Sequence, residues 1–144
     1  MTTADLSGIT LDDLIPHRDS MMLIDDIIEV DSHYALTSSV ISASYPLVDE
    51  NGVHPLIMVE LAAQTAGVCN GLDRIKTKGI DSLKMGWLVG VKRAQFYIEH
   101  IPLGSTVFTR SENSHNYENL REVSCVVHLD KRLIGEVTLQ LFQA

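Results

Sequence analysis

The stretch from Leu56 to Leu72 carries a single charged residue, Glu60. Its apolar residues lie on nearly every side of a helix, and this pattern predicts a long helix over roughly residues 56–76. Pro55 suits the first turn of such a helix. A helix that is apolar nearly all round must be covered on most of its sides, so the remainder of the chain has to supply a sheet that wraps it.

The other segments supply strands for that sheet and one short helix. Thr10 is a good N-cap for a helix over residues 11–15, which Pro16 ends. Further runs are rich in β-branched and aromatic residues and are separated by turn residues. These predicted strands are Met22–Val30, His33–Ile41, Trp87–Tyr97, Thr106–Ser114, Arg121–Leu129 and Arg132–Phe142. The order predicts an α+β hotdog fold, in which a curved antiparallel sheet of about six strands wraps a long central helix, with a short N-terminal helix beside it.

Length and charge limit what the chain does. Its 144 residues suit one domain over residues 1–144, because no linker-like segment divides them. The formal net charge of −8 disfavours nucleic acid and anionic membrane as partners. No segment has the pattern of a membrane span or a secretory signal. Cys69 and Cys125 fit no metal-ligand spacing, so we expect two reduced thiols in a cytoplasmic protein without metal or other cofactor.

Glu60 is the first candidate catalytic residue. An ionised carboxylate within an apolar helix is costly unless it is paired, hydrogen-bonded or used in chemistry. Gln64 lies four residues further on, on the same helix face, and can hold the Glu60 side chain by a hydrogen bond. The alternative is a solvent-facing Glu60 that only favours the helix dipole.

Two histidines are candidate partners of this carboxylate. His54 directly precedes the long helix, and an imidazole can transfer protons near neutral pH. The backbone N–H groups at the start of that helix can also polarise a carbonyl oxygen. His17 follows the proline that ends the short helix. Either residue can instead be structural, His54 as a loop residue and His17 as a capping or packing residue.

Three segments share their order along the chain with one enzyme family. Residues 15–25 read Ile-Pro-His-Arg-Asp-Ser-Met-Met-Leu-Ile-Asp, and residues 60–64 read Glu-Leu-Ala-Ala-Gln. Residues 90–96 read Gly-Val-Lys-Arg-Ala-Gln-Phe, before Pro102 and Gly104. These segments resemble the Leu-Pro-His-Arg opening, the Glu-x-x-Ala-Gln helix start and the Gly-Ile-Asp-x-Ala-Arg-Phe strand of the (3R)-hydroxyacyl-[acyl carrier protein] dehydratases of type II fatty acid synthesis. The resemblance covers roughly residues 11–104.

The resemblance implies a hotdog dimer in which Glu60 of one chain meets a histidine of the other. The histidine would take the proton at C2, next to the thioester carbonyl, and the carboxylic acid would protonate the departing 3-hydroxyl. An acid that is protonated near neutral pH needs a raised pKa, which apolar surroundings supply. We expect a thioester of acyl carrier protein or CoA as substrate, bordered by Gln64, Gly67 and Pro55.

The loop before the central helix departs from that family. His54 lies six residues before Glu60, closer than the family's catalytic histidine lies to its acid, so His17 stays a candidate base. The shortened loop, the Pro-His opening and the Glu-x-x-Ala-Gln helix start are similar to the dehydratase-like proteins of bacterial aryl polyene pathways. That branch is the favoured one.

The basic residues that could bind an acidic carrier protein also differ from those of the family. The family's Phe-Lys-Arg-Pro run is replaced by Phe-Tyr-Ile-Glu at residues 96–99, and Lys92 and Arg93 are the predicted substitutes. A second basic cluster, Arg74, Lys76 and Lys78, is interpreted as ordinary solvated surface. We expect a homodimer or a higher oligomer of dimers, with a heteromer of two dehydratase subunits as a further possibility.

Two other functions fit parts of the pattern. Gly52-Val53-His54 resembles the loop of hotdog thioesterases, although Pro55 and the spacing to Glu60 argue against that class. The abbreviated loop is also compatible with a non-catalytic subunit that stabilises an active dehydratase subunit. The three hypotheses differ in product: dehydration removes water and keeps the thioester, hydrolysis releases a free thiol, and a silent subunit does neither alone.

Overall fold

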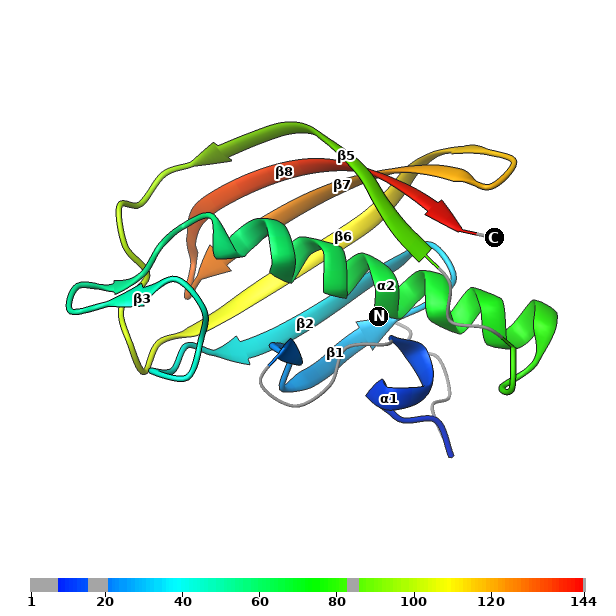
Figure 1. The fold of residues 1–144 in the computed structure, drawn as a ribbon, viewed down its shortest axis with the longest axis horizontal. Helices are drawn as coiled ribbons and strands as arrows, with labels where there is room; N and C mark the ends of the chain where they lie inside the picture. The colour runs from blue at the N-terminus through cyan, green and yellow to red at the C-terminus, as the bar shows by residue number, and fades with distance from the viewer. Residues whose placement is uncertain (1–7, 16–20, 83–85, 144) are drawn as a thin grey trace.

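The computed structural model describes residues 8–15, 21–82 and 86–143, in which a curved sheet wraps one long helix (Figure 1). The helices within these residues are α1 (Leu11–Leu14) and α2 (Ile57–Lys78). The strands are β1 (Asp26–Val30), β2 (Tyr34–Val40), β3 (Val48–Asp49), β4 (Gly52–Val53), β5 (Gly86–Phe96), β6 (Thr106–Tyr117), β7 (Leu120–Leu129) and β8 (Arg132–Gln143).

The main sheet has six strands among the described residues, in the order β1-β2-β6-β7-β8-β5. Every neighbouring pair is antiparallel. Helix α2 lies along the concave side of this sheet, and α1 packs beside α2 (Figure 1). Strand β5 follows α2 in the sequence but lies at the edge beyond β8, so β1 and β5 form the two edges. The predicted hotdog fold, with its long central helix and short N-terminal helix, is confirmed.

Helix α2 is buried along most of its length, as its apolar sequence predicts. The buried residues of α2 include Ile57, Leu61, Val68 and Leu72. At Gly71 a side-chain carbon would overlap the carbonyl oxygen of Leu14, so α1 approaches the backbone of α2 at this point. Glycine is therefore required where the two helices meet.

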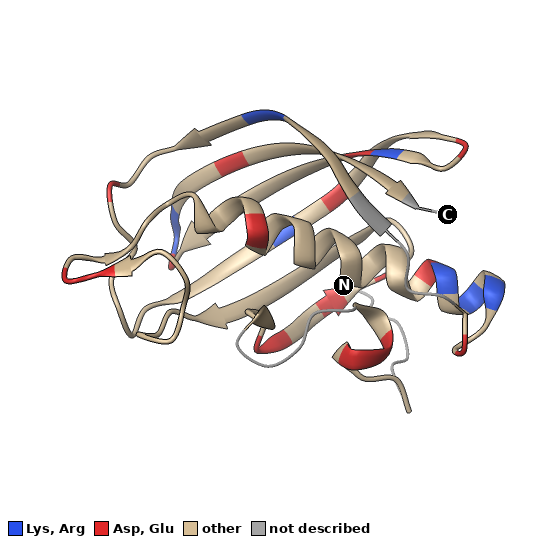
Figure 2. Cartoon of the chain, in the orientation of Figure 1, with Lys and Arg blue, Asp and Glu red and all other residues tan. Residues whose placement is uncertain are grey.

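Arg74 links three parts of the chain and is only 3% exposed. Its Nη1 donates to the backbone oxygen and to Oγ of Ser82, each across 2.8 Å. Its Nη2 donates to the carbonyl oxygen of Asp13 across 2.5 Å. The interpretation of Arg74 as part of a solvated basic cluster is therefore wrong, because these carbonyl groups draw the guanidinium inward. Lys76 and Lys78 are exposed at the C-terminal end of α2 (Figure 2).

The side chains of β2 that face α2 are small, and two of the three are polar. Ala35, Thr37 and Ser39 are buried on this face, whereas the side chains between them point away from the helix. The hydroxyl oxygens of Thr37 and Thr65 lie 2.9 Å apart and share a hydrogen bond between the strand and the helix. Small side chains here let the helix approach the sheet, and the hydroxyl group of Thr37 finds a partner on the helix.

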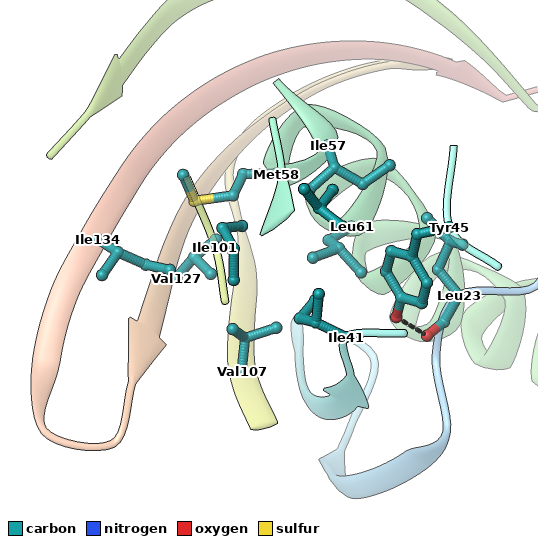
Figure 3. Close-up of a cluster of buried hydrophobic side chains, with 11 residues drawn as sticks. Leu23, Ile41, Tyr45, Ile57, Met58, Leu61, Ile101, Val107, Val127 and Ile134 are labelled. Atoms are coloured by element: carbon teal, nitrogen blue, oxygen red, sulfur yellow. Dashed lines mark hydrogen bonds between the residues drawn. The ribbon is translucent and has the colours of Figure 1, made fainter. Parts of the chain in front are cut away.

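One apolar cluster surrounds the first turns of α2 (Figure 3). It is formed by Leu23, Ile41, Tyr45, Val53, Ile57, Met58, Leu61, Ile101, Val107, Val127 and Ile134. Tyr45 reaches through it and donates its hydroxyl hydrogen to the carbonyl oxygen of Leu23 across 2.9 Å, the dashed line of Figure 3. Burial raises the pKa of Tyr45 to about 12. The cluster thus anchors residue 23 beside the start of α2.

Two local features differ from the prediction. Residues 48–53, which belong to none of the predicted strands, form a short hairpin in which Val48 pairs with Val53. Val53 also exchanges two backbone hydrogen bonds of 2.9 Å with Ile101. Strand β1 begins at Asp26 rather than at Met22, because residues 21–23 hydrogen-bond to a side chain of α2 instead of to a strand. Among the described residues, no helix combines the length and apolar character needed to cross a membrane.

Candidate active site

Glu60 lies in the first turn of α2 with its side chain partly exposed. Gln64 donates a hydrogen bond from Nε2 to Glu60 Oε1 across 2.9 Å, so the predicted contact is present. A carboxylate in the first turn also lies beside the positive end of the helix dipole. The position of this carboxylate is therefore defined by the helix start and by Gln64 together.

Gln64 is fully buried, and its amide bonds to three groups of the protein. Besides its bond to Glu60, Nε2 donates to the carbonyl oxygen of Met21 across 2.7 Å. Its Oε1 accepts the N–H of Leu23 across 3.0 Å. We expected Gln64 to border the substrate, but its side chain has no exposed surface in this structure. Its contacts are instead with Glu60 and with residues 21–23.

His17 lies outside the described residues, and its predicted catalytic role is not tested. The segment that begins four residues later is anchored to the protein from two sides. Gln64 holds Met21 and Leu23, and the hydroxyl of Tyr45 holds the carbonyl oxygen of Leu23. No sequence pattern pointed to Tyr45, because its partner lies 22 residues away. A buried tyrosine with one carbonyl acceptor is visible only once the chain is folded.

His54 is exposed and caps the start of α2 with its ring. Nδ1 accepts a hydrogen bond from the N–H of Leu56 across 3.0 Å. The backbone N–H of His54 donates to the carbonyl oxygen of Leu47 across 3.0 Å, and its own carbonyl oxygen accepts the N–H of Ile57 across 3.1 Å. Both the main chain and one ring nitrogen of His54 are thus fixed by the turn that leads into the helix.

The backbone N–H groups at this helix start are all engaged within the chain. Pro55 has no N–H, and the N–H of Leu56 bonds to His54. The N–H groups of residues 57, 58 and 59 donate to carbonyl oxygens three positions earlier, across 3.1, 2.9 and 3.0 Å. The prediction that free N–H groups polarise a carbonyl oxygen here is therefore wrong for this structure, because a tight first turn uses them internally.

Pro55 and Gly67, the other residues expected to border a substrate, are placed by packing. Pro55 is buried in the turn between β4 and α2. A side-chain carbon at Gly67 would press against a methyl group of Ile15, so this glycine faces the segment after α1. Their predicted contact with substrate is not tested by these positions.

Lys92 and Arg93, the predicted partner-binding residues, are exposed on β5 and already have contacts in the chain. Nζ of Lys92 lies 2.7 Å from Oε1 of Glu122. The hydrogen bond between these groups raises the pKa of Lys92 and lowers the pKa of Glu122. Nδ1 of His115 lies 3.0 Å from the second oxygen of Glu122, and Lys92 and His115 both border a surface cavity of about 240 Å³. Arg93 donates to Gln95 across 2.9 Å.

The titratable side chains of the described residues form no metal site. Within residues 8–15, 21–82 and 86–143, no group of three or more histidine, cysteine, aspartate or glutamate side chains is arranged to hold a metal ion. The site described above consists of a glutamate held by a buried glutamine, with a histidine at the entry to the same helix.

Solved structures share this fold at low sequence identity. A chain of the dehydratase heterocomplex ApeI:P from Xenorhabdus doucetiae matches with a TM-score of 0.83 and 20% identity, over 93% of this chain and 90% of that chain. The uncharacterized protein PH1136 from Pyrococcus horikoshii matches with a TM-score of 0.71 and 15% identity, over 99% and 94% of the two chains. An HP0420 homologue from Helicobacter felis matches with a TM-score of 0.71 and 11% identity, over 92% and 99%.

Sequence comparison identifies the family. No curated protein matches the sequence significantly. Residues 9–144 match the ApeP-like family, which is described as ApeP dehydratase. The match spans nearly the whole chain and agrees with the resemblance seen in the three sequence segments. The chain therefore belongs to the ApeP-like family of dehydratases.

Proposed function

We propose that this chain takes part in the dehydration of a 3-hydroxyacyl thioester, carried on acyl carrier protein or CoA, to the trans-2-enoyl thioester. The family supports dehydration, and the hydrogen bond that holds Glu60 against Gln64 supports Glu60 as the acid. In this reaction the C2–H bond breaks and its proton passes to a base. The C3–O bond breaks as Glu60 gives its proton to the hydroxyl, water leaves, and a C2=C3 double bond forms.

The base in this proposal is a histidine, either His54 or His17. Its task is to take the C2 proton beside the thioester carbonyl, for which an imidazole suits neutral pH. The pathway that we favour is polyene-type or fatty acid biosynthesis, since the family is that of ApeP dehydratases and the sequence resembles the aryl polyene branch.

We further propose that a second hotdog subunit pairs with the β5 edge and completes the site. Strand β5 is hydrogen-bonded to β8 on one side, and it exposes Leu88, Val89 and Val91. A long edge strand with exposed apolar side chains is a ready template for another strand. The similar chain from Xenorhabdus doucetiae comes from a complex named as a dehydratase heterocomplex, which favours a non-identical dehydratase subunit as the partner.

Mass spectrometry of a 3-hydroxyacyl carrier protein, before and after incubation with the purified protein, tests the reaction. Dehydration appears as loss of one water with the thioester intact, and it reverses when the enoyl form is supplied. Release of carrier thiol would instead identify a thioesterase and would contradict the proposal.

Substitution of Glu60 by Gln tests the proposed acid. The amide keeps the shape of the side chain but cannot give up a proton in the same way, so we expect the rate to fall about 10²–10⁴-fold. Glu50→Gln in the exposed hairpin tip is the matched control and should retain the native rate. If the Glu60→Gln protein remains as active as native, Glu60 is not the acid.

A non-catalytic subunit is the second candidate function, favoured by the heterocomplex of the similar chain. Such a subunit would leave the carrier protein unchanged alone and would raise the activity of a co-purified dehydratase subunit. Glu60→Gln in this chain would then leave the activity of the complex unchanged, whereas the proposed function predicts its loss.

A further inference from the structure

Tyr45 is a buried residue of the loop between β2 and β3, and its hydroxyl reaches residue 23. It is 7% exposed and lies with Leu23 in the apolar cluster of Figure 3. Its hydroxyl donates to the carbonyl oxygen of Leu23 across 2.9 Å. Burial raises the pKa of Tyr45 to about 12, so the hydroxyl keeps its proton at neutral pH. Tyr45 is therefore a donor to Leu23 under ordinary conditions.

Leu23 links Tyr45 to Gln64. Its carbonyl oxygen accepts from Tyr45, and its N–H donates to Oε1 of Gln64 across 3.0 Å. Its side chain is 2% exposed and packs in the same apolar cluster. A residue that is held by its side chain and by both of its backbone polar groups cannot shift without breaking a buried hydrogen bond. A displacement at the carbonyl group of Leu23 is therefore passed to its N–H and to the Gln64 amide.

The N–H of Leu23 also determines which end of the Gln64 amide faces Glu60. An amide has one oxygen that accepts and one NH₂ group that donates twice. Because the oxygen accepts from Leu23, the NH₂ group is directed at Met21 and Glu60, across 2.7 and 2.9 Å. The reversed amide would bring its oxygen against two acceptors and its NH₂ group against a donor. The bond to Glu60 thus depends on residue 23 as well as on helix spacing.

We infer that Tyr45 is a positioning residue for Glu60. It acts through the backbone of Leu23 and the side chain of Gln64, and it does not touch the substrate. This inference rests on the proposed role of Glu60 as the acid. Without the Tyr45 hydroxyl the buried carbonyl group of Leu23 has no partner, so residues 21–23 shift toward another donor. The Gln64 amide follows, and the carboxyl group of Glu60 loses the alignment that proton transfer requires.

Side-chain NMR tests this coupling without any activity measurement. The NH₂ signals of Gln64 in ¹H–¹⁵N spectra report both of its donated hydrogen bonds, and their loss in the Gln64→Met protein identifies them. We expect Tyr45→Phe, whose ring still fills the cluster, to shift these signals. Tyr34→Phe is the matched control, because it removes a hydroxyl that bonds Glu29 across 2.8 Å at the other end of β2. Gln64 signals that respond to neither substitution would overturn the inference.

A double-mutant cycle tests whether Tyr45 acts through Glu60. We expect Tyr45→Phe to lower kcat by about 10- to 10²-fold, as a displaced catalytic group does, while KM stays within about twofold because Tyr45 is buried. In the Glu60→Gln protein the same substitution should lower kcat little further, since the two residues act as one unit. Tyr34→Phe should retain native kcat. Equal losses from Tyr45→Phe in both backgrounds, or native kcat in the Tyr45→Phe protein, would overturn the inference.

Gln64→Met is the second variant, because it removes the proposed link and leaves Tyr45 in place. It should lower kcat at least as much as Tyr45→Phe does, and the combined protein should be no slower than Gln64→Met alone. Native kcat in the Gln64→Met protein would overturn the inference even if the Tyr45→Phe protein did not fold.

These experiments also separate the inference from the proposed function. A native protein that removes no water, alone or with its partner subunit, contradicts the proposed dehydration even if its Gln64 signals respond to Tyr45→Phe, and the positioning of an acid is then excluded as well. A protein that removes water and loses this activity in the Glu60→Gln variant, while its Gln64 signals do not respond to Tyr45→Phe, contradicts the inference alone.

Discussion

Gln64 shows how one buried amide can define the position of a carboxylate. Both N–H groups of its Nε2 are used, one by Glu60 and one by the carbonyl oxygen of Met21. Its oxygen accepts the N–H of Leu23. A buried amide whose N–H groups and oxygen are all hydrogen-bonded has one favoured orientation, because any rotation leaves a polar group unpaired. Gln64 is therefore a positioning residue for Glu60.

The two cysteines should be inert in the folded protein. Cys69 and Cys125 are buried free thiols, and burial raises the pKa of each from 9.0 to about 12. The thiolate is the nucleophile, so native protein at about pH 8 should resist iodoacetamide. Mass spectrometry should find both residues alkylated only after urea is added. Rapid alkylation of either residue without urea would contradict this prediction.

The same pKa shift predicts a loss of stability at alkaline pH. Thiols of the unfolded chain lose protons near pH 9.0, whereas folded thiols keep theirs until about pH 12. The unfolded state then binds fewer protons than the folded state, so the free energy of unfolding falls as pH rises across this window. Urea midpoints across that range measure the fall, and it should be smaller in a protein with both cysteines changed to Ala.

At the scale of elements, helix α2 organises the molecule, and α1 packs against it at a point where no side chain fits. The carbonyl oxygen of Leu14 occupies the space beside Gly71. Arg74 closes the same contact by donating to Asp13 and to Ser82. Packing of α1 therefore depends on the absence of a side chain at Gly71 and on the buried guanidinium group of Arg74, one turn later in α2.

Alanine at two glycines of α2 tests this packing. Alanine favours a helix over glycine by about 1 kcal/mol, which sets the same baseline at both positions. At Gly71 the new methyl group meets the Leu14 backbone, so we expect Gly71→Ala to lower the free energy of unfolding by about 1–3 kcal/mol. At Gly67 it meets a methyl group of the buried Ile15 side chain instead of backbone atoms, so Gly67→Ala should lower the free energy of unfolding less than Gly71→Ala does. Equal urea midpoints for the two variants would contradict the model of close backbone contact.

Long elements of this fold could be predicted from the sequence, and contacts between distant residues could not. The apolar run of residues 56–72 predicted α2, because its composition holds over many turns. The β3–β4 hairpin has strands of two residues each, too short for a periodic pattern. The Glu60–Gln64 bond followed from helix spacing, whereas the partners of Gln64 at Met21 and Leu23 lie 43 and 41 residues away. The hydrogen bonds of the N–H groups at the start of α2 could not be predicted either, because they depend on the conformation of the folded turn.

The two edge strands of the main sheet, β1 and β5, differ in length and in their exposed side chains. Strand β1 has five residues, whereas strand β5 has eleven residues and a run of exposed apolar side chains. Both strands shift register against their neighbours. Short edges resist pairing, whereas long edges with exposed apolar side chains promote it. This contrast is the basis for proposing β5, rather than β1, as the edge that meets a second subunit.

Lysine substitutions at matched positions of the two edges test the proposal. Val89 in β5 is 59% exposed and Ile28 in β1 is 39% exposed, and each lies where its strand shifts register. Val89→Lys places a charge at the proposed interface, so we expect a smaller assembled fraction by light scattering, while Ile28→Lys should assemble as native protein does. Assembly of the Val89→Lys protein at the native level would exclude this part of β5 from the interface.

The N–H of Leu23 has a consequence for how the candidate site can be monitored. It lies outside every helix and strand of the described residues, yet it bonds to the buried oxygen of Gln64. Amides in such irregular segments exchange with solvent quickly unless a specific partner protects them. Deuterium uptake at this one amide thus reports whether Gln64, which also bonds to Glu60, keeps its hydrogen bond to Leu23. The measurement needs no substrate. Rapid uptake there, with the strands still protected, would mark a chain that is folded while its candidate site is open.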